Sequence, residues 1–313
     1  MSLALDISLL ILLFAALAIV SNLVVERVKY IASILRVRLF VFGILLGFVT
    51  TLPELALGIS TIMDDVPSIS LGNLIGGPIV MIGLILGSSL FFGRKIGTDG
   101  SLKTLLPIAL VVFLPILLGL DSRYSLLDGA LMIFSYAALL AYLYKANHFD
   151  HHPQIKIPKK NRIASSIFIS IIGTVGIIVF SNWIVEITLD FLEYVTLGRL
   201  AIGLMVFSIG TNLPEISISL ISWRKKSSEL SLSHLLSSAF TNTLVLGILA
   251  STSPIVFVIS KTYWVTGFFL MLILGLLLYF YHSEKKMDRR EGGVLLLTYV
   301  LFMSVVIYLS ISV

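Results

Sequence analysis

The chain has 313 residues, of which 58% are apolar and only 12% are charged, with a formal net charge of +5 and a mean hydropathy of +1.05. This composition excludes a soluble globular domain, a disordered segment and a coiled coil, because each of these carries roughly twice this share of charged residues. The absence of cysteine excludes disulfides, thiolate metal ligands and a cysteine nucleophile. What remains is a polytopic membrane protein.

Ten apolar stretches follow one another along the chain, each about as long as the roughly 20-residue helix that crosses a bilayer. They do not alternate in hydrophobicity, as the strands of a membrane barrel would. The residues before the first stretch include Asp6 and no basic residue, which argues against a cleavable signal peptide. The sequence therefore predicts an all-α polytopic membrane protein with ten transmembrane helices, at 7–25, 39–62, 70–92, 104–120, 125–144, 163–182, 197–222, 230–250, 263–281 and 293–311.

Basic residues are distributed unevenly between the loops that join these stretches. Nineteen of the 22 lysines and arginines fall in the odd-numbered loops, and only Arg123, Arg199 and Lys261 fall in the even-numbered ones. Because cytoplasmic loops carry the excess of Lys and Arg, we expect the odd loops in the cytoplasm and both termini to be extracytoplasmic. This topology explains the positive charge without nucleic acid as a partner. It predicts an integral protein of the plasma membrane, surrounded by the lipid bilayer.

One five-residue motif occurs twice. Residues 50–54 read Thr-Thr-Leu-Pro-Glu and residues 211–215 read Thr-Asn-Leu-Pro-Glu, an offset of 161. The chain is thus predicted to comprise a first five-helix repeat at 1–144, a cytoplasmic linker at 145–162 and a second repeat at 163–313. Because five is odd, the second repeat enters the membrane from the opposite side. Inverted repeats around a site at the midplane are a recurring plan of secondary transporters.

Each Leu-Pro-Glu motif lies inside a long apolar stretch and predicts a broken helix. A proline within a helix frees a carbonyl about one turn earlier, and in lipid a bound cation can satisfy such a carbonyl. Glu54 and Glu215 follow the two breaks and are the acidic residues deepest in any stretch. An intramembrane carboxylate is a functional candidate. The alternative is a plain proline kink with a protonated glutamate bonded to a neighbouring helix, and it fits one copy better than two symmetric ones.

Further oxygen donors surround these glutamates. Oxygen ligands without cysteine point to hard cations, and two carboxylates neutralise one divalent ion. Ca²⁺ tolerates an irregular cage better than Mg²⁺ does. We expect Glu54 and Glu215 to be the metal ligands, with cation-binding oxygens from Thr50, Thr51, Thr211 and Asn212 at the breaks and from Ser238 and Asn242 on the following helix. No His-Glu-x-x-His or Gly-x-Ser-x-Gly motif is present, so an enzyme is not expected, and no cofactor is implied beyond transported ions.

These residues resemble the membrane region of the cation/calcium exchanger superfamily, in its sodium/calcium exchanger branch. That family carries two alpha repeats of the form Gly-Thr-Ser-x-Pro-Glu, and Gly210-Thr211-Asn212-Leu213-Pro214-Glu215 is similar to one of them. The resemblance implies that Glu54 and Glu215 are the central cation-binding glutamates and that Thr50 and Thr211 line the site. It also implies that Thr51 and Asn212 stand where the family has serine.

The helices that follow the two motifs depart from the family pattern. The family's serine and second asparagine in the first repeat fall on Gly77 and Pro78, and its next asparagine falls on Met81. In the second repeat, Asn242 stands where many sodium/calcium exchangers have aspartate. Gly77 and Met81 remove two oxygen donors, so at least one sodium site implied by the resemblance looks incomplete.

Three functions stay open at this point. The first is a secondary active antiporter that exchanges Ca²⁺ against Na⁺ by alternating access. The second is a proton-coupled exchanger, because burial favours the neutral form of an acid and the two glutamates could carry H⁺. The third is a degenerate membrane protein that binds a cation without transporting it, which the losses at Gly77 and Met81 would favour. The sequence leaves the coupling ion and the oligomeric state open.

Overall fold

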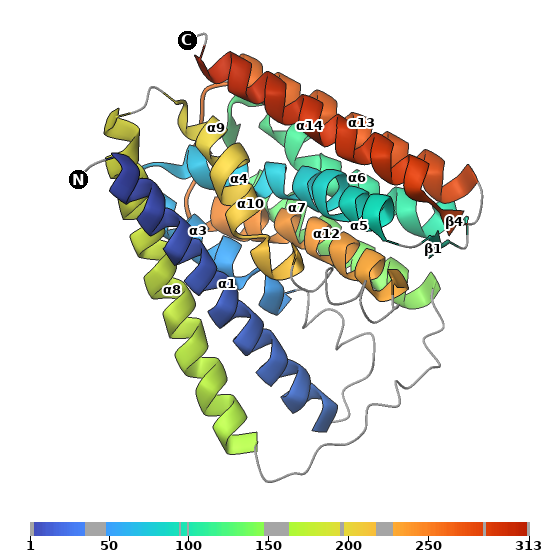
Figure 1. The fold of residues 1–313 in the computed structure, drawn as a ribbon, viewed down its shortest axis with the longest axis horizontal. Coiled ribbons are helices and arrows are strands. Elements are labelled where there is room, and N and C mark those ends of the chain that lie inside the picture. Colours follow the sequence, from blue (N-terminus) through green and yellow to red (C-terminus); the bar gives the residue numbers. More distant parts are fainter. Residues whose placement is uncertain are drawn as a thin grey trace.

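A computed structural model describes residues 3–34, 48–93, 95–98, 100–146, 163–194, 197–216, 228–283 and 286–311, and these are almost entirely helical (Figure 1). The first half holds α1 (Leu3–Ile34), α3 (Leu52–Met63), α4 (Pro67–Ile79), the π-helix η1 (Val80–Leu86), α5 (Gly87–Phe92), α6 (Leu102–Leu118) with the short η2 (Gly119–Asp121), and α7 (Leu126–Ala146). The second half holds α8 (Ile163–Tyr194), α9 (Arg199–Ile202), the π-helix η4 (Gly203–Phe207), α10 (Ser208–Gly210), α12 (Ser228–Thr252), α13 (Lys261–Ser283) and α14 (Arg289–Ile311).

Eight spans in the described part of the chain are long and apolar enough to cross a membrane. They coincide with eight of the ten predicted stretches, so the chain is an all-helical membrane protein. The other two stretches, 39–62 and 197–222, reach into residues outside the described part, and only α3 and α9 to α10 represent them. Of the predicted linker at 145–162, residues 147–162 also lie outside it.

Two small antiparallel pairings correct the prediction of helices alone. Strand β1 (Ile96–Gly97) pairs with β4 (Lys286–Met287), and β2 (Arg123–Tyr124) pairs with β3 (Ile255–Val256). The pairs form because backbone groups at helix ends need hydrogen-bond partners, and each supplies them from a neighbouring loop. Each pair joins a loop of the first half to a loop of the second. In both cases the charge pattern assigns the two loops to the same side of the membrane.

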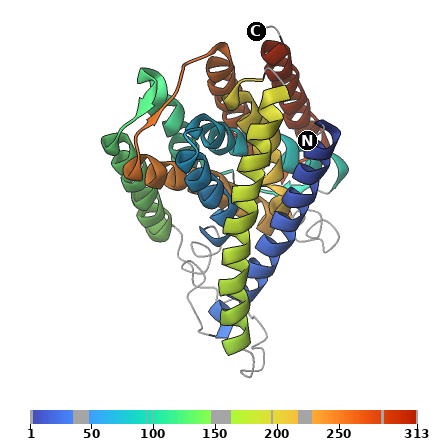
Figure 2. The same cartoon turned by 90° about the vertical axis from the view of Figure 1, so that its left-hand side faces the viewer.

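The helices α1 and α8 are longer than predicted. Their expected ends were 25 and 182, whereas they run to Ile34 and Tyr194, so Arg27 lies in a helix and not in a loop. No proline or glycine stops either helix earlier. The two helices pack against each other and extend beyond the other described helices, as both views show (Figures 1 and 2).

The α4 to α5 span and α12 are the most buried of the eight described spans. About 83% of the α4 to α5 span and 72% of the α12 span are buried, against 17% of α8. One hydrophobic cluster surrounds η1, α12, α13 and α14, and a second lies between α1, α3 and α8. Polar side chains on α4 and α12 are therefore held away from lipid, where they can form a site.

A close backbone approach joins α4 to the second half. A Cβ at Gly72 would overlap the Leu200 carbonyl oxygen and lie 2.9 Å from the Gly203 Cα. A Cβ at Gly203 would in turn overlap the Ile69 carbonyl oxygen. Small residues allow such approaches in membrane proteins. This contact brings η4 and α10, and with them residues 211–215, against α4.

We expect Gly72→Ala to lower the melting temperature of the detergent-solubilised protein. The added methyl has no room, and overpacking of this kind costs about 1–3 kcal/mol. Gly275→Ala is the matched control, because a Cβ at Gly275 in α13 meets no atom within 4 Å. Alanine should be tolerated there. Equal melting temperatures for the two variants would contradict the tight contact.

Candidate functional site

A turn interrupts the helix just before each buried glutamate. Thr51 forms a turn between residues 48–50 and α3, and Thr211 and Asn212 form a turn between α10 and the helical residues 213–216. Pro53 and Pro214 have no N–H, so the carbonyls four residues earlier have no helical donor. Both turns therefore concentrate backbone and side-chain oxygens at the same point of the motif.

Glu54 and Glu215 are completely buried and lie close enough for their charges to interact. The Ser238 hydroxyl of α12 donates to Oε1 of Glu215 at 3.1 Å. Among the described residues, no donor reaches Oε2 of Glu215 or either carboxylate oxygen of Glu54. A buried carboxylate without partners is costly, so three of the four carboxylate oxygens have an unmet requirement for positive charge.

Thr211 joins the two halves through Asn73. Its hydroxyl lies beside Glu54, but it donates to Oδ1 of Asn73 on α4 at 3.1 Å. A hydroxyl has one hydrogen, so Glu54 receives none from it. Asn73 is fully buried and was absent from the predicted site. The Gly72-Asn73 pair, which is similar to the Gly-Asn of the family pattern, could have identified it.

Two asparagines meet next to Gly77. The Nδ2 of Asn212 donates to the Ser208 carbonyl at 2.7 Å, and the Nδ2 of Asn242 donates to the Leu74 carbonyl at 3.3 Å. A Cβ at Gly77 would overlap the Asn242 Nδ2 and lie 3.6 Å from the Asn212 Nδ2. The Oδ1 atoms of both asparagines are buried and receive no donor from the described chain.

These contacts bring together six of the eight predicted residues: Glu54, Glu215, Thr211, Asn212, Ser238 and Asn242. Thr50, which ends the helical residues 48–50, and Thr51, in the turn that follows, are both buried just before Glu54. Elsewhere in the sequence, Met81 on η1 is also fully buried, but a thioether is a poor ligand for Na⁺ or Ca²⁺.

The chemistry of the cluster suits a hard cation. It contains acceptor oxygens without donors on four side chains, two acidic and two neutral. Within the described ranges, no group of three or more His, Cys, Asp or Glu residues could hold a metal. Carboxylate, amide and hydroxyl oxygens are ligands for Ca²⁺, Na⁺ and Mg²⁺, whereas softer metals prefer nitrogen and sulfur.

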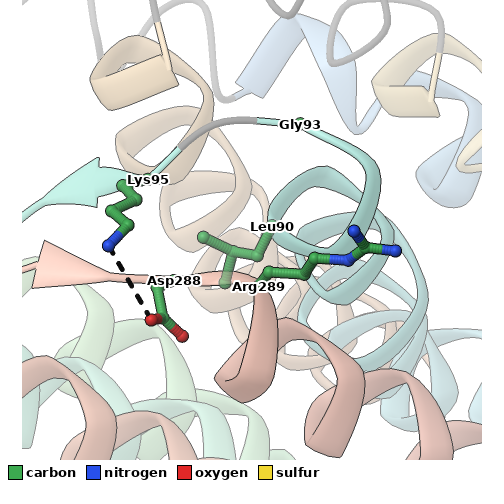
Figure 3. Close-up of a pocket in the computed structure, with 5 residues that line it drawn as sticks. All are labelled: Leu90, Gly93, Lys95, Asp288 and Arg289. Atoms are coloured by element: carbon green, nitrogen blue, oxygen red, sulfur yellow. Dashed lines mark ion pairs between the residues drawn. The ribbon is translucent and has the colours of Figure 1, made fainter.

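A surface pocket of about 490 Å³ at the β1–β4 pair is a different feature (Figure 3). Leu90, Gly93, Lys95, Asp288 and Arg289 line it. The ammonium of Lys95 lies 4.0 Å from a carboxylate oxygen of Asp288, and the Arg289 guanidinium lies 4.8 Å from the centre of the Phe91 ring. Two cationic side chains in its wall disfavour a bound cation, so the buried cluster is the better candidate.

Both the sequence and the fold resemble known membrane exchangers. The family model described as sodium/calcium exchanger protein matches residues 5–145 and 165–308. The sodium/calcium exchanger MaX1 of Methanosarcina acetivorans is 24% identical, over 92% of this chain and 95% of that protein. The structure of the sodium-calcium exchanger NCX_Mj soaked with 10 mM Na⁺ has a TM-score of 0.66 at 23% identity, and covers 97% of this chain and 99% of that one. The H⁺/Ca²⁺ exchanger CAX has a TM-score of 0.74 at 14% identity, over 98% of this chain and 87% of its own.

We expect Glu54→Gln and Glu215→Gln each to weaken Ca²⁺ binding by at least about a hundredfold. Removing one carboxylate leaves a buried divalent ion half neutralised, which costs about 3 kcal/mol or more. Isothermal titration calorimetry of the purified protein measures the effect. Glu186→Gln is the control, because Glu186 is exposed on α8. Similar losses in all three variants would mean that the site lies elsewhere.

Proposed function

The chain belongs to the sodium/calcium exchanger family of membrane cation exchangers, and on that premise we propose that it is a secondary active antiporter that exchanges Ca²⁺ against Na⁺ by alternating access. A member of this family is a transporter and not an enzyme. The observation that carries the proposal is the pair of buried carboxylates, Glu54 and Glu215, with three oxygens that receive no donor from the described chain.

The proposed ligand set follows from these contacts. Two carboxylates balance the charge of one Ca²⁺, and the ion needs about six to eight oxygens in a flexible arrangement. Glu54 and Glu215 supply the charge in this proposal. The remaining oxygens come from side chains of Thr50, Thr51, Thr211, Asn212, Ser238 and Asn242 and from the carbonyls that the two motif prolines release.

The proposed architecture is ten transmembrane helices in two inverted five-helix repeats, 1–144 and 163–313, with a cytoplasmic linker at 145–162 and broken helices at the two Leu-Pro-Glu motifs. The turns at Thr51 and at Thr211 and Asn212 support it, because they interrupt the helix at equivalent points. The two strand pairs support it as well, because each joins loops that the charge pattern assigns to one side. We place the protein in the plasma membrane with both termini extracytoplasmic.

Proton coupling is the second candidate. Neither carboxylate oxygen of Glu54 receives a donor from the described chain, so one of the two could carry a proton, and a neutral acid is favoured where water is excluded. Gly77 and Met81 contribute no side-chain oxygen where the resemblance implies sodium ligands. Binding without transport is the third candidate, and it rests on the same two positions.

Uptake of ⁴⁵Ca²⁺ into proteoliposomes separates the three candidates. We expect uptake to be driven by an imposed Na⁺ gradient and abolished by Glu54→Gln. Uptake that responds only to an H⁺ gradient would replace the proposal with proton coupling. Calcium binding without uptake under either gradient would identify a non-transporting protein.

Reporter fusions test the proposed topology. We expect a fusion after residue 313 to report the extracytoplasmic side and one within 145–162 to report the cytoplasm, because most basic residues lie in the odd loops. A pair of reporters, one active only outside and one only inside the cell, gives opposite signals at the two points. Cytoplasmic signals at both would refute the inverted ten-helix arrangement.

A further inference from the structure

Pro78 lies inside α4 and releases the carbonyl of Leu74. A helical N–H at position 78 would donate to the carbonyl four residues earlier, but proline has no N–H. An unsatisfied carbonyl in the interior of a membrane protein costs several kcal/mol. The missing donor comes from the other half of the chain, because the Nδ2 of Asn242 on α12 donates to the Leu74 carbonyl at 3.3 Å.

Gly77 provides the room for this contact. Any Cβ at position 77 would overlap the Asn242 Nδ2. The glycine is thus more than a lost oxygen donor, because a serine there would displace the amide from the Leu74 carbonyl. Gly77, Pro78 and Asn242 therefore act together. The first half of the chain supplies the free carbonyl and the space beside Gly77, and the Asn242 amide of the second half occupies that space and donates to the carbonyl.

The contact also fixes the orientation of the Asn242 oxygen. An amide is planar, so directing its nitrogen to Leu74 directs its oxygen to the opposite side. That Oδ1 atom is buried and receives no donor from the described residues. The amides of Asn242 and Asn212 both lie next to Gly77, and Ser238, one turn before Asn242, donates to Glu215. Asn242 thus presents a neutral oxygen to the cluster.

We propose that the carbonyl released by Pro78 selects an amide at position 242, and thereby holds the cation site at two carboxylates. An aspartate at 242 has no hydrogen to donate when ionised, and its oxygen would face the Leu74 oxygen. Pro78 acts as a positioning residue through Asn242 and does not touch the ion. The effect on Ca²⁺ binding rests on the proposed function, whereas the hydrogen bond between Asn242 and Leu74 is independent of it.

The test is a double-mutant cycle on Asn242→Asp and Pro78→Ala, with Ca²⁺ affinity measured by calorimetry. In the protein with Pro78, we expect Asn242→Asp to weaken binding about tenfold, the effect of losing one hydrogen bond to a buried group. In the Pro78→Ala protein, the new N–H satisfies Leu74, so both carboxylate oxygens can turn to the ion. There we expect Asn242→Asp to tighten Ca²⁺ binding.

The matched control is another proline inside a helix, Pro115 of α6. Pro115 releases the carbonyl of Val111, and the hydroxyl of Thr243, next to Asn242 in sequence, donates to that carbonyl at 3.0 Å. We expect Thr243→Val to lower the melting temperature without changing Ca²⁺ affinity. Pro115→Ala should leave the weakening caused by Asn242→Asp unchanged. A reversal that appears with Pro78→Ala and not with Pro115→Ala therefore supports the proposal.

If Asn242→Asp tightened Ca²⁺ binding equally with Pro78 and with Pro78→Ala, the proposal would be overturned. The added charge alone would then determine the affinity. If the acidic variants do not fold, melting temperatures replace affinities. Asn242→Ala should then destabilise the protein more with Pro78 than with Pro78→Ala, and equal destabilisation would overturn the proposal. This second measurement needs no Ca²⁺, so an absence of Ca²⁺ binding would contradict the proposed function and leave this test intact.

Discussion

Glu54 and Glu215 are completely buried at a point where the described residues offer an ionised carboxylate too few hydrogen-bond donors, and the rest of the core is packed around this constraint. Only Ser238 donates to the pair among the residues described. Other donors near them are directed at different acceptors: the Thr211 hydroxyl at Asn73 and the two asparagine amides at backbone carbonyls. The cluster thus leaves several of its oxygens without internal hydrogen bonds, and this arrangement is the basis for the proposed cation site.

Proline is the residue that makes oxygens available throughout this core. Each proline inside a helix leaves one carbonyl without its usual donor, and the chain treats these carbonyls differently. Asn242 and Thr243 satisfy the carbonyls released by Pro78 and Pro115, whereas Pro53 and Pro214 follow the turns and directly precede the glutamates. Two adjacent residues of α12 therefore satisfy carbonyls on two proline-containing helices, and the helix that carries part of the candidate site also binds its neighbours α4 and α6.

Features that depend on short stretches of sequence could be predicted. The apolar stretches, the repeated Leu-Pro-Glu motif and the two glutamates are local. Eight of the predicted spans are found, and six of the predicted site residues lie close together, while their role stays a prediction. The ends of α1 and α8 could not be predicted well, because no proline or glycine marks them. The contact of Asn73 with Thr211, and the use of the space beside Gly77, depend on residues more than 130 positions away. No local pattern contains such information.

The contact between Asn242 and Leu74 also shows how the two halves of the chain depend on each other. At equivalent positions, 161 residues apart, one copy has Met81 and the other Asn242. The first half supplies the backbone acceptor at Leu74, and the second half supplies the side chain that donates to it. With methionine in place of Asn242, the carbonyl released by Pro78 would have no side-chain donor. The hydrogen bond therefore joins the two halves in one direction only, because Met81 has no amide with which to form an equivalent one.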